Sequence, residues 1–148
     1  MDRVLLVLGG IAIAGIVAAL VGRRSAPPAA NTHHVPRQLD RADFPRPEAP
    51  WLVAVFTSAT CSTCAGVWER AQHLASDQVA VVELELGAAK DLHERYKIDG
   101  VPTLVITDDS GAVQRAFLGP TTATDLWAAM ADVREPGSVP PDCHTGEV

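Results

Sequence analysis

Residues 51–64 read WLVAVFTSATCSTC, in which an apolar run, Trp51 to Phe56, leads into a pair of cysteines, Cys61 and Cys64. The run is continuous and rich in β-favouring residues, which predicts a central strand that is buried on both faces. Two cysteines at the i, i+3 spacing of a first helical turn can form and break an intramolecular disulfide. The start of a helix also favours the thiolate form of a cysteine. This turn is therefore a candidate site for redox chemistry.

The residues that follow predict a helix and a second strand. A helix after Cys61 carries two apolar sets at helical spacing, which suits packing on a sheet. The sets are Cys61, Cys64, Ala65, Trp68 and Ala75, and beside them Val67, Ala71 and Leu74. Val79 to Leu86 is the next strand. The two strands of such a βαβ unit must be parallel, with a right-handed crossover.

The second half of the chain completes an α/β domain. In order, we expect a short helix over residues 88–97, a strand over residues 103–107, a strand over residues 112–118 and a last helix after Gly119. The turn signal Asp108-Asp109-Ser110-Gly111 predicts an antiparallel hairpin between the two strands. Thr121 or Thr124 can cap the last helix, which would turn apolar residues toward the sheet. These residues are Leu126, Ala129, Met130 and Val133.

A membrane anchor is predicted at the N-terminus, within residues 1–22. Residues 4–21 carry no charge, and at about 1.5 Å per residue they just span a hydrocarbon core of roughly 30 Å. A cleaved signal peptide is the alternative, but its apolar region is normally about 7 to 15 residues long. The longer run here ends at Arg23-Arg24, which favours one uncleaved transmembrane helix.

The charges that flank this span indicate the side of the membrane. One basic residue, Arg3, precedes the span, whereas Arg23, Arg24, Arg37 and Arg41 follow it. The positive flank normally stays in the cytoplasm, so we expect a single-pass protein of the cell membrane with its soluble domain on the cytoplasmic side. An extracytoplasmic domain is the alternative, because a short N-terminal segment with one Arg can also stay inside.

Proline-rich segments flank the predicted domain. Residues 23–48 read as a Pro/Ala-rich linker, with a short first element near Leu39 to Phe44. The folded domain should then cover residues 49–133. Residues 134–148 have no periodic pattern and predict a flexible C-terminal tail.

Charge and cysteine content limit the classes of function. The net charge is −6 and the longest basic run is the pair Arg23-Arg24, so the sequence shows no basic surface for nucleic acid. Three cysteines in 148 residues do not make the disulfide framework of a small secreted domain. They leave a redox pair with one extra thiol, or a metal site.

Four features match the thioredoxin family in the same order, from about Trp51 to Val133. They are the buried strand before Cys61 and Cys64, the sequence Gly100-Val101-Pro102-Thr103, the hairpin, and Gly119 before the last helix. The chain therefore resembles a thioredoxin, which implies a central mixed sheet of about four to five strands flanked by helices. A Cys-x-x-Cys motif alone is less specific, since it also occurs in zinc sites.

The resemblance implies a role for each residue of the site. Cys61 would be the attacking thiol, and Cys64 the resolving thiol that closes on the mixed disulfide and releases the reduced substrate. Pro102 matches the family's cis-proline, so the Val101-Pro102 bond would be cis, an isomer that proline adopts at low cost. Because Pro102 lacks an N–H, a substrate strand has room to pair with the backbone of Val101. The resemblance implies no metal, and no cofactor other than the Cys61-Cys64 disulfide.

The chain departs from the family at three places. Thr60 replaces the usual Trp before the first cysteine, at a position that contacts substrate, and Ser62-Thr63 replaces Gly-Pro between the cysteines. That dipeptide strongly affects the reduction potential, so the direction of electron flow stays open. The buried acid that the family carries six residues before the first cysteine falls on Val55. A proton acceptor for Cys64 is therefore missing from its usual place.

Glu83 is the candidate for this missing proton acceptor. It falls where the family usually has a lysine, in an otherwise apolar strand. Partial burial near a thiol raises the pKa of a carboxyl group into the range suited to proton transfer. The alternative is that Glu83 points to solvent at the end of its strand.

The remaining cysteine, histidines and tryptophans have simpler interpretations. Cys143 and His144 could complete a Cys3His zinc site with the dithiol, or Cys143 could be a third thiol or link two chains. An unpaired, solvated cysteine suits the tail better. The histidines are expected on the surface, and the tryptophans in ordinary packing on helix faces. The histidines are His33, His34, His73 and His93, and the tryptophans are Trp68 and Trp127.

These observations predict a membrane-anchored thiol:disulfide oxidoreductase that acts in cell redox homeostasis. It would exchange electrons with protein disulfides or dithiols and with a redox partner, through Cys61 and Cys64. The alternative is a non-catalytic module of the same fold that binds a protein or senses redox state, with the cysteines as metal ligands in one version.

Overall fold

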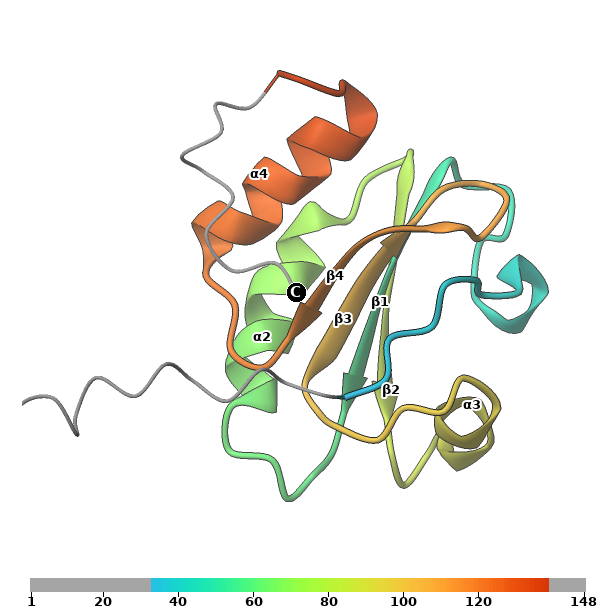
Figure 1. The fold of residues 1–148 in the computed structure, drawn as a ribbon, viewed down its shortest axis with the longest axis vertical. Helices are drawn as coiled ribbons and strands as arrows, with labels where there is room; N and C mark the ends of the chain where they lie inside the picture. Colours follow the sequence, from blue (N-terminus) through green and yellow to red (C-terminus); the bar gives the residue numbers. More distant parts are fainter. Residues whose placement is uncertain (1–32, 139–148) are drawn as a thin grey trace, which may run out of the picture. The chain divides into compact units, whose positions relative to one another are not determined.

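The computed structural model describes residues 33–138, and residues 1–32 and 139–148 lie outside the described part of the chain. Figure 1 shows a twisted sheet with helices on both faces. The elements are, in order, the 3-10 helix η1 (Arg41–Asp43), β1 (Trp51–Thr57), α2 (Cys64–Ala71), the 3-10 helix η2 (Gln72–Leu74), β2 (Val79–Glu85), α3 (Lys90–Arg95), β3 (Thr103–Thr107), β4 (Val113–Leu118) and α4 (Ala123–Arg134). The predicted α/β class is confirmed.

Four of the sequence predictions fall wholly or partly on residues outside this range. They are the transmembrane segment at residues 4–21, the first part of the linker at residues 23–48, most of the tail at residues 134–148, and the pair Cys143-His144. Within residues 33–138, no helix combines the length and the apolar character that a membrane span requires. The anchor and the side of the membrane therefore stay predictions.

The four strands form one mixed sheet in the order β2-β1-β3-β4. β1 pairs in parallel with β2, and β3 pairs antiparallel with both β1 and β4, so the predicted βαβ unit and hairpin are present. β1 is central, and Leu52 to Thr57 are all buried. Phe56 lies opposite Thr103. The loop that leaves β1 and the loop that enters β3 therefore meet at one end of the sheet (Figure 1).

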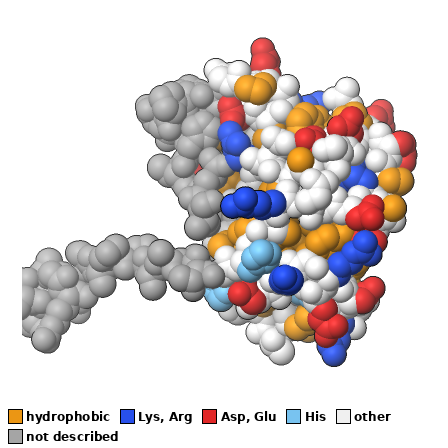
Figure 2. Space-filling model, turned by 45° about the vertical axis from the view of Figure 1, so that its right-hand side comes forward, with side chains coloured by type: hydrophobic (Ala, Val, Ile, Leu, Met, Phe, Trp, Pro, Cys, Tyr) orange, Lys and Arg blue, Asp and Glu red, His pale blue; other side chains and the backbone are white. Residues whose placement is uncertain are grey.

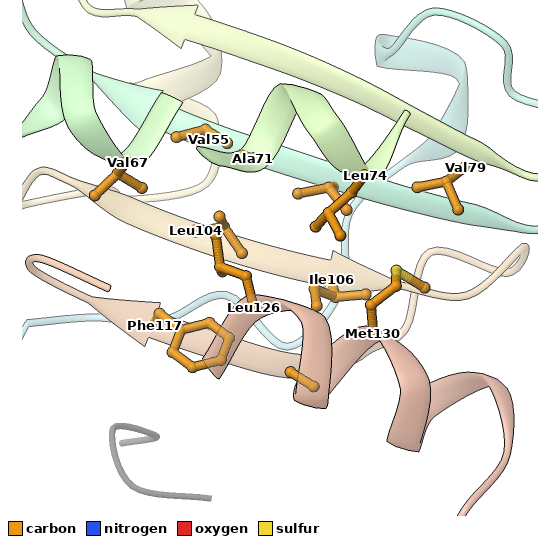
Figure 3. Packing of buried hydrophobic residues seen from close by; sticks show 12 residues of the cluster. Val55, Val67, Ala71, Leu74, Val79, Leu104, Ile106, Phe117, Leu126 and Met130 are labelled. Carbon is orange, nitrogen blue, oxygen red and sulfur yellow. The ribbon is translucent and has the colours of Figure 1, made fainter. Parts of the chain in front are cut away.

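One face of the sheet is covered by α2 and α4. Figure 3 shows apolar side chains of these helices directed onto strand residues, with Val55 among them. The cluster includes Val67, Ala71 and Leu74 from the first helical segment, Leu126, Ala129 and Met130 from α4, and Leu104, Ile106 and Phe117 from the sheet. Each large side chain that leaves water in such a core contributes about 1.5 to 3 kcal/mol. This packing fixes α2, and with it Cys64, against β1.

The other face is covered by α3 and by residues 35–49. Leu39 and Phe44 pack with strand residues and with Tyr96, which follows α3. The Tyr96 hydroxyl donates to Asp43 and accepts the backbone N–H of Asp40 at 3.0 Å. Burial, followed by the hydrogen bond to Asp43, raises the pKa of Tyr96 to about 12. The polypeptide that enters the domain is thus part of its core.

Three local predictions from the sequence were wrong. His93 is buried, because its ring packs edge-to-face on Phe56 at 5.1 Å and its Nε2 lies 2.8 Å from the Leu84 carbonyl oxygen. Trp127 is 54% exposed, since it lies on the outer side of α4 next to the buried Leu126. α4 is capped by Thr122, through a capping box with Asp125, and not by Thr121 or Thr124. Trp68 packs against the core as predicted.

The surface carries charges of both signs. On the face shown in Figure 2, Lys and Arg side chains lie among Asp and Glu, with apolar side chains between them. The coloured residues of that view show no continuous basic patch. This distribution agrees with the net charge of −6.

Candidate active site

Cys61 and Cys64 form a disulfide at the point where the β1–α2 loop becomes helix. Their Cα atoms are 5.5 Å apart. Cys64 is the first residue of α2 and only 3% exposed, whereas Cys61 lies in the preceding turn and is partly exposed. The helix begins one turn later than the sequence predicted. An incoming sulfur can therefore reach Cys61 more readily than Cys64.

The turn that carries Cys61 is held by local hydrogen bonds. The Cys61 N–H donates to the Ser58 carbonyl at 3.0 Å, and the Thr60 N–H lies 3.3 Å from the Ser58 hydroxyl. Cys61 Sγ is 3.7 Å from the Thr63 hydroxyl. Thr60 and Thr63 are both exposed. Small polar side chains thus occupy the rim of the disulfide where the family usually has Trp and Gly-Pro.

A cis peptide bond, Val101-Pro102, lies in the loop that enters β3. This agrees with what the resemblance implied for Pro102. The Thr103 hydroxyl donates to the Gly100 carbonyl at 2.8 Å, and the Pro102 carbonyl accepts the Gly119 N–H at 2.8 Å. Because Phe56 pairs with Thr103, this loop and the disulfide turn share one end of the sheet. Val101 is partly exposed there and Pro102 is buried.

Val55 and Glu83 are paired neighbours in the sheet. Val55 is fully buried beneath α2, so no acid occupies that position. Glu83 is its register partner on β2, and its side chain is exposed. The Glu83 carboxylate accepts a hydrogen bond of 2.9 Å from the hydroxyl of the buried Thr57. Glu83 thus shares the sheet face of Val55 and contacts solvent, and its role as proton acceptor for Cys64 stays a prediction.

Glu85 binds the disulfide loop, and the sequence did not suggest this. Its carboxylate accepts the backbone N–H of Ala59 at 3.0 Å, and also those of Gly87 at 2.7 Å and Ala88 at 3.1 Å. The only signal in the sequence was an acid next to the end of a predicted strand, two residues before a glycine. Among residues 33–138, no group of three His, Cys, Asp or Glu side chains is arranged to hold a metal ion.

The family model of thioredoxin matches residues 42–132, which is more than half of the chain. The chain belongs to the thioredoxin family. A thioredoxin fold with a cysteine pair at disulfide distance at the start of a helix fits thiol–disulfide oxidoreductase chemistry in general. No curated protein sequence matches this chain.

Several solved structures share this thioredoxin fold. A single-residue mutant of a thioredoxin from Halobacterium salinarum NRC-1 is 23% identical, with a TM-score of 0.50, over 63% of this chain and 80% of that one. Thioredoxin O2 from Arabidopsis thaliana, in the oxidized state, is 19% identical with a TM-score of 0.50, over 58% and 76%. A thioredoxin-fold protein from Helicobacter pylori is 13% identical with a TM-score of 0.51, over 66% and 84%. At these identities the likeness establishes the fold.

Proposed function

We propose that this protein is a membrane-tethered thiol:disulfide oxidoreductase that exchanges electrons with protein disulfides through Cys61 and Cys64. The observation that carries the proposal is the asymmetry of the disulfide. Cys61 is partly exposed in the turn, whereas Cys64 is buried as the first residue of α2. One sulfur is therefore accessible to a substrate and the other is accessible mainly to its partner cysteine.

The exchange requires two displacements at sulfur. The Cys61 thiolate attacks one sulfur of the substrate disulfide, which forms a mixed disulfide and releases a substrate thiolate. The Cys64 thiol then loses its proton and attacks Cys61 Sγ, which forms the Cys61-Cys64 disulfide and releases the second substrate thiolate. The substrate gains two electrons and the protein loses two. The reverse sequence oxidises a substrate dithiol, and the reduction potential decides which direction operates.

Three residues around the disulfide would support the substrate. Val101 and Pro102 border the same end of the sheet as Cys61, and a proline offers no N–H that would block an extended chain. A substrate strand placed there pairs with the Val101 backbone and brings its sulfur toward Cys61. The exposed Thr60 offers a hydroxyl at the rim of the site in place of an aromatic ring.

Glu83 would accept the proton that Cys64 loses. Its position supports the role, because it is the register partner of Val55 on the sheet face that α2 covers. The hydrogen bond from Thr57 orients its carboxylate. A Glu83→Gln variant keeps the shape and cannot accept a proton, so the second displacement should slow about tenfold. Stopped-flow release of the second substrate thiol measures this step, and an unchanged rate and pH profile would remove Glu83 from the mechanism.

Trapping of the mixed disulfide tests the oxidoreductase function itself. In the full-length Cys64→Ser variant the second displacement cannot occur, so a disulfide-linked complex with insulin should accumulate through Cys61. The Cys61→Ser variant is the matched control and should trap nothing, provided that both variants also carry Cys143→Ser to remove the tail thiol. A wild-type chain that reduces no insulin, together with zinc in the purified protein, would instead favour the non-catalytic module. The reduction potential of the dithiol, set against glutathione, assigns the direction.

Residues 4–21 would provide the membrane tether, with the flanking arginines placing the domain on the cytoplasmic side. A charged residue at the centre of a span costs about 2.5 to 3.5 kcal/mol, so Ile13→Arg should release the full-length protein from membranes at alkaline pH. Asn31→Arg, outside the span, is the control. Loss of a C-terminal tag to protease in intact cells would assign the domain to the outer side.

A further inference from the structure

Glu85 connects the two loops that leave the parallel pair of strands. It is the last residue of β2 and the register partner of Thr57, the last residue of β1. One carboxylate oxygen accepts the N–H of Ala59, in the disulfide loop, at 3.0 Å. The other accepts the N–H groups of Gly87 and Ala88, in the β2–α3 loop, at 2.7 and 3.1 Å. One side chain thus ties both loops together.

Two neighbouring residues, Leu86 and Gly87, help to hold the two loops near each other. A Cβ atom at Gly87 would lie 2.8 Å from the nearer Glu85 oxygen, so a glycine there lets the carboxylate approach the backbone. The Leu86 N–H also donates to the Thr57 carbonyl at 2.9 Å, which continues the pairing of the strands beyond their ends. The two loops therefore have a fixed mutual position.

The charge of Glu85 suits three N–H donors. The hydrogen bond from Ala59 is the largest cause that lowers the pKa of Glu85 below its ordinary value, and those from Gly87 and Ala88 add to it against partial desolvation. The carboxylate is therefore ionised at neutral pH, and hydrogen bonds to an ionised acceptor are stronger than neutral ones.

Two hydrogen bonds and one peptide unit connect the Glu85 carboxylate to Cys61. Ala59 follows Ser58, whose carbonyl accepts the Cys61 N–H, so an anchored Ala59 fixes the turn from which Cys61 projects. Cys64 is fixed separately, by the packing of α2 on the core. Two independently anchored sulfurs close a disulfide with little further loss of freedom, which favours the closed form.

We propose that Glu85 is a positioning residue for disulfide exchange, which holds Ala59 and thereby sets the place of Cys61 relative to Cys64. The proposal rests on the oxidoreductase function proposed above. It predicts that loss of the anchor weakens the Cys61-Cys64 disulfide even when the domain stays folded. The relevant quantity is the equilibrium constant for oxidation of the dithiol by glutathione disulfide.

Two substitutions remove the anchor by different means. Glu85→Gln removes the charge and leaves one acceptor oxygen for two loops. Gly87→Ala keeps the charge, but its methyl group displaces the carboxylate. The matched control is Asp108→Asn, because Asp108 also accepts several N–H groups but lies in the β3–β4 turn, at the other end of the sheet. Full-length proteins are equilibrated in glutathione buffers, and the fraction of the Cys61-Cys64 disulfide is measured by mass spectrometry, with circular dichroism as the check on folding.

The expected result is a fall of about three- to tenfold in the equilibrium constant for both Glu85→Gln and Gly87→Ala, with Asp108→Asn within about twofold of the parent. A fall in Glu85→Gln alone would mean that the charge acts without the anchor and would overturn the proposal. An unchanged constant in both variants, or an equal fall in Asp108→Asn, would overturn it as well. Failure of the parent both to reduce insulin and to oxidise a reduced protein dithiol would instead overturn the oxidoreductase function, which this equilibrium does not measure.

Discussion

Each end of the sheet has a carboxylate that accepts several backbone N–H groups, but the two carboxylates hold different parts of the chain. We call the loops after β1, after β2 and before β3 the disulfide end, and the β3–β4 turn with residues 37–49 the turn end. At the disulfide end the Glu85 carboxylate joins two loops and leaves Cys61 partly exposed. At the turn end the Asp108 carboxylate accepts from residues of its own turn, including Ser110 and Ala112. The first arrangement holds the loop that carries the Cys61 sulfur, and the second stabilises the β3–β4 turn.

The turn end is also reinforced by a buried arginine. Arg41 donates to the carbonyls of Asp108 at 2.8 Å, Ala49 at 3.0 Å and Arg46 at 3.2 Å. It therefore connects the entering polypeptide to the hairpin. Because Arg41 and its backbone partners lie at the end of the sheet opposite the disulfide, we expect changes at the turn end to alter stability and changes at the disulfide end to alter the exchange reaction.

Loss of Arg41 should give the largest effect. Arg41→Met keeps much of the side-chain volume but leaves the three carbonyls without their donor, which should lower the free energy of unfolding by about 3 kcal/mol. Urea denaturation measures this change, and Arg37→Met, at an exposed position, is the control. The rate of insulin reduction by the folded variant should equal that of the parent. A slower rate at equal folded fraction would mean that the two ends are coupled.

An acid restored at Val55 should test the disulfide end. If Glu83 accepts the proton of Cys64, Val55→Asp should restore within about threefold the exchange rate that Glu83→Gln lowers about tenfold. Val55→Asn in the same background shares the cost of a buried polar group and offers no proton acceptor. Stopped-flow rates of the second displacement, compared at equal folded fraction, separate the two. Equal rates for the Asp and Asn variants would show that proton transfer there does not limit exchange.

Asp108→Asn should have a smaller effect that depends on pH. Burial raises the pKa of Asp108, but hydrogen bonds from Ser110, Ala112 and Gln114 outweigh it and hold the pKa below its ordinary value. The ionised form therefore adds stability above the unfolded pKa of about 4, and this is lost as the pH falls through the folded pKa. The variant should be about 1 kcal/mol less stable at neutral pH, and the difference should vanish in acid. Urea titrations at several pH values check this, and a constant difference would contradict it.

Trp127→Ala should have the smallest effect. The side chain is 54% exposed on the outer side of α4, and substitutions at such positions usually change stability by less than about 0.5 kcal/mol. Leu126→Ala, the neighbouring position in the core, should cost about 2 to 5 kcal/mol. Thermal unfolding of the two variants compares them directly. A large loss for Trp127→Ala would mean that the ring covers apolar surface.

The sequence was sufficient for the fold because its signals are local and agree with one another. The run from Trp51 to Phe56 is apolar without interruption, and it forms the central strand. The turn signal after Thr107 gave the hairpin, and the motifs around Cys61 and Pro102 gave the family. Each of these patterns spans a few residues, so it can be recognised without knowing which distant residues it packs against.

Contacts between residues far apart in the chain could not be predicted from the sequence. Glu85 meets Ala59 across 26 positions, and nothing in either neighbourhood marks the pair. The burial of His93 could not be predicted, because its partners, Phe56 and the Leu84 carbonyl, lie on two different strands. Three threonines lie near the start of α4, and Thr122 is the cap because its side chain and that of Asp125 form a capping box.

The segment before η1 runs beside the β3–β4 hairpin, and this affects whether the outer strand can pair with another molecule. β4 is an outer strand of the sheet, and exposed outer strands invite pairing between molecules. At the start of β4 that pairing is already taken, since the Val113 N–H donates to the Arg37 carbonyl at 3.0 Å and the Leu39 N–H to the Gly111 carbonyl at 2.9 Å. Gly111 has a φ of +82°, and a Cβ there would lie 1.9 Å from the Leu39 carbonyl oxygen, so only glycine allows this close contact. The leading segment thus occupies backbone groups at the start of this outer strand that could otherwise pair with another copy.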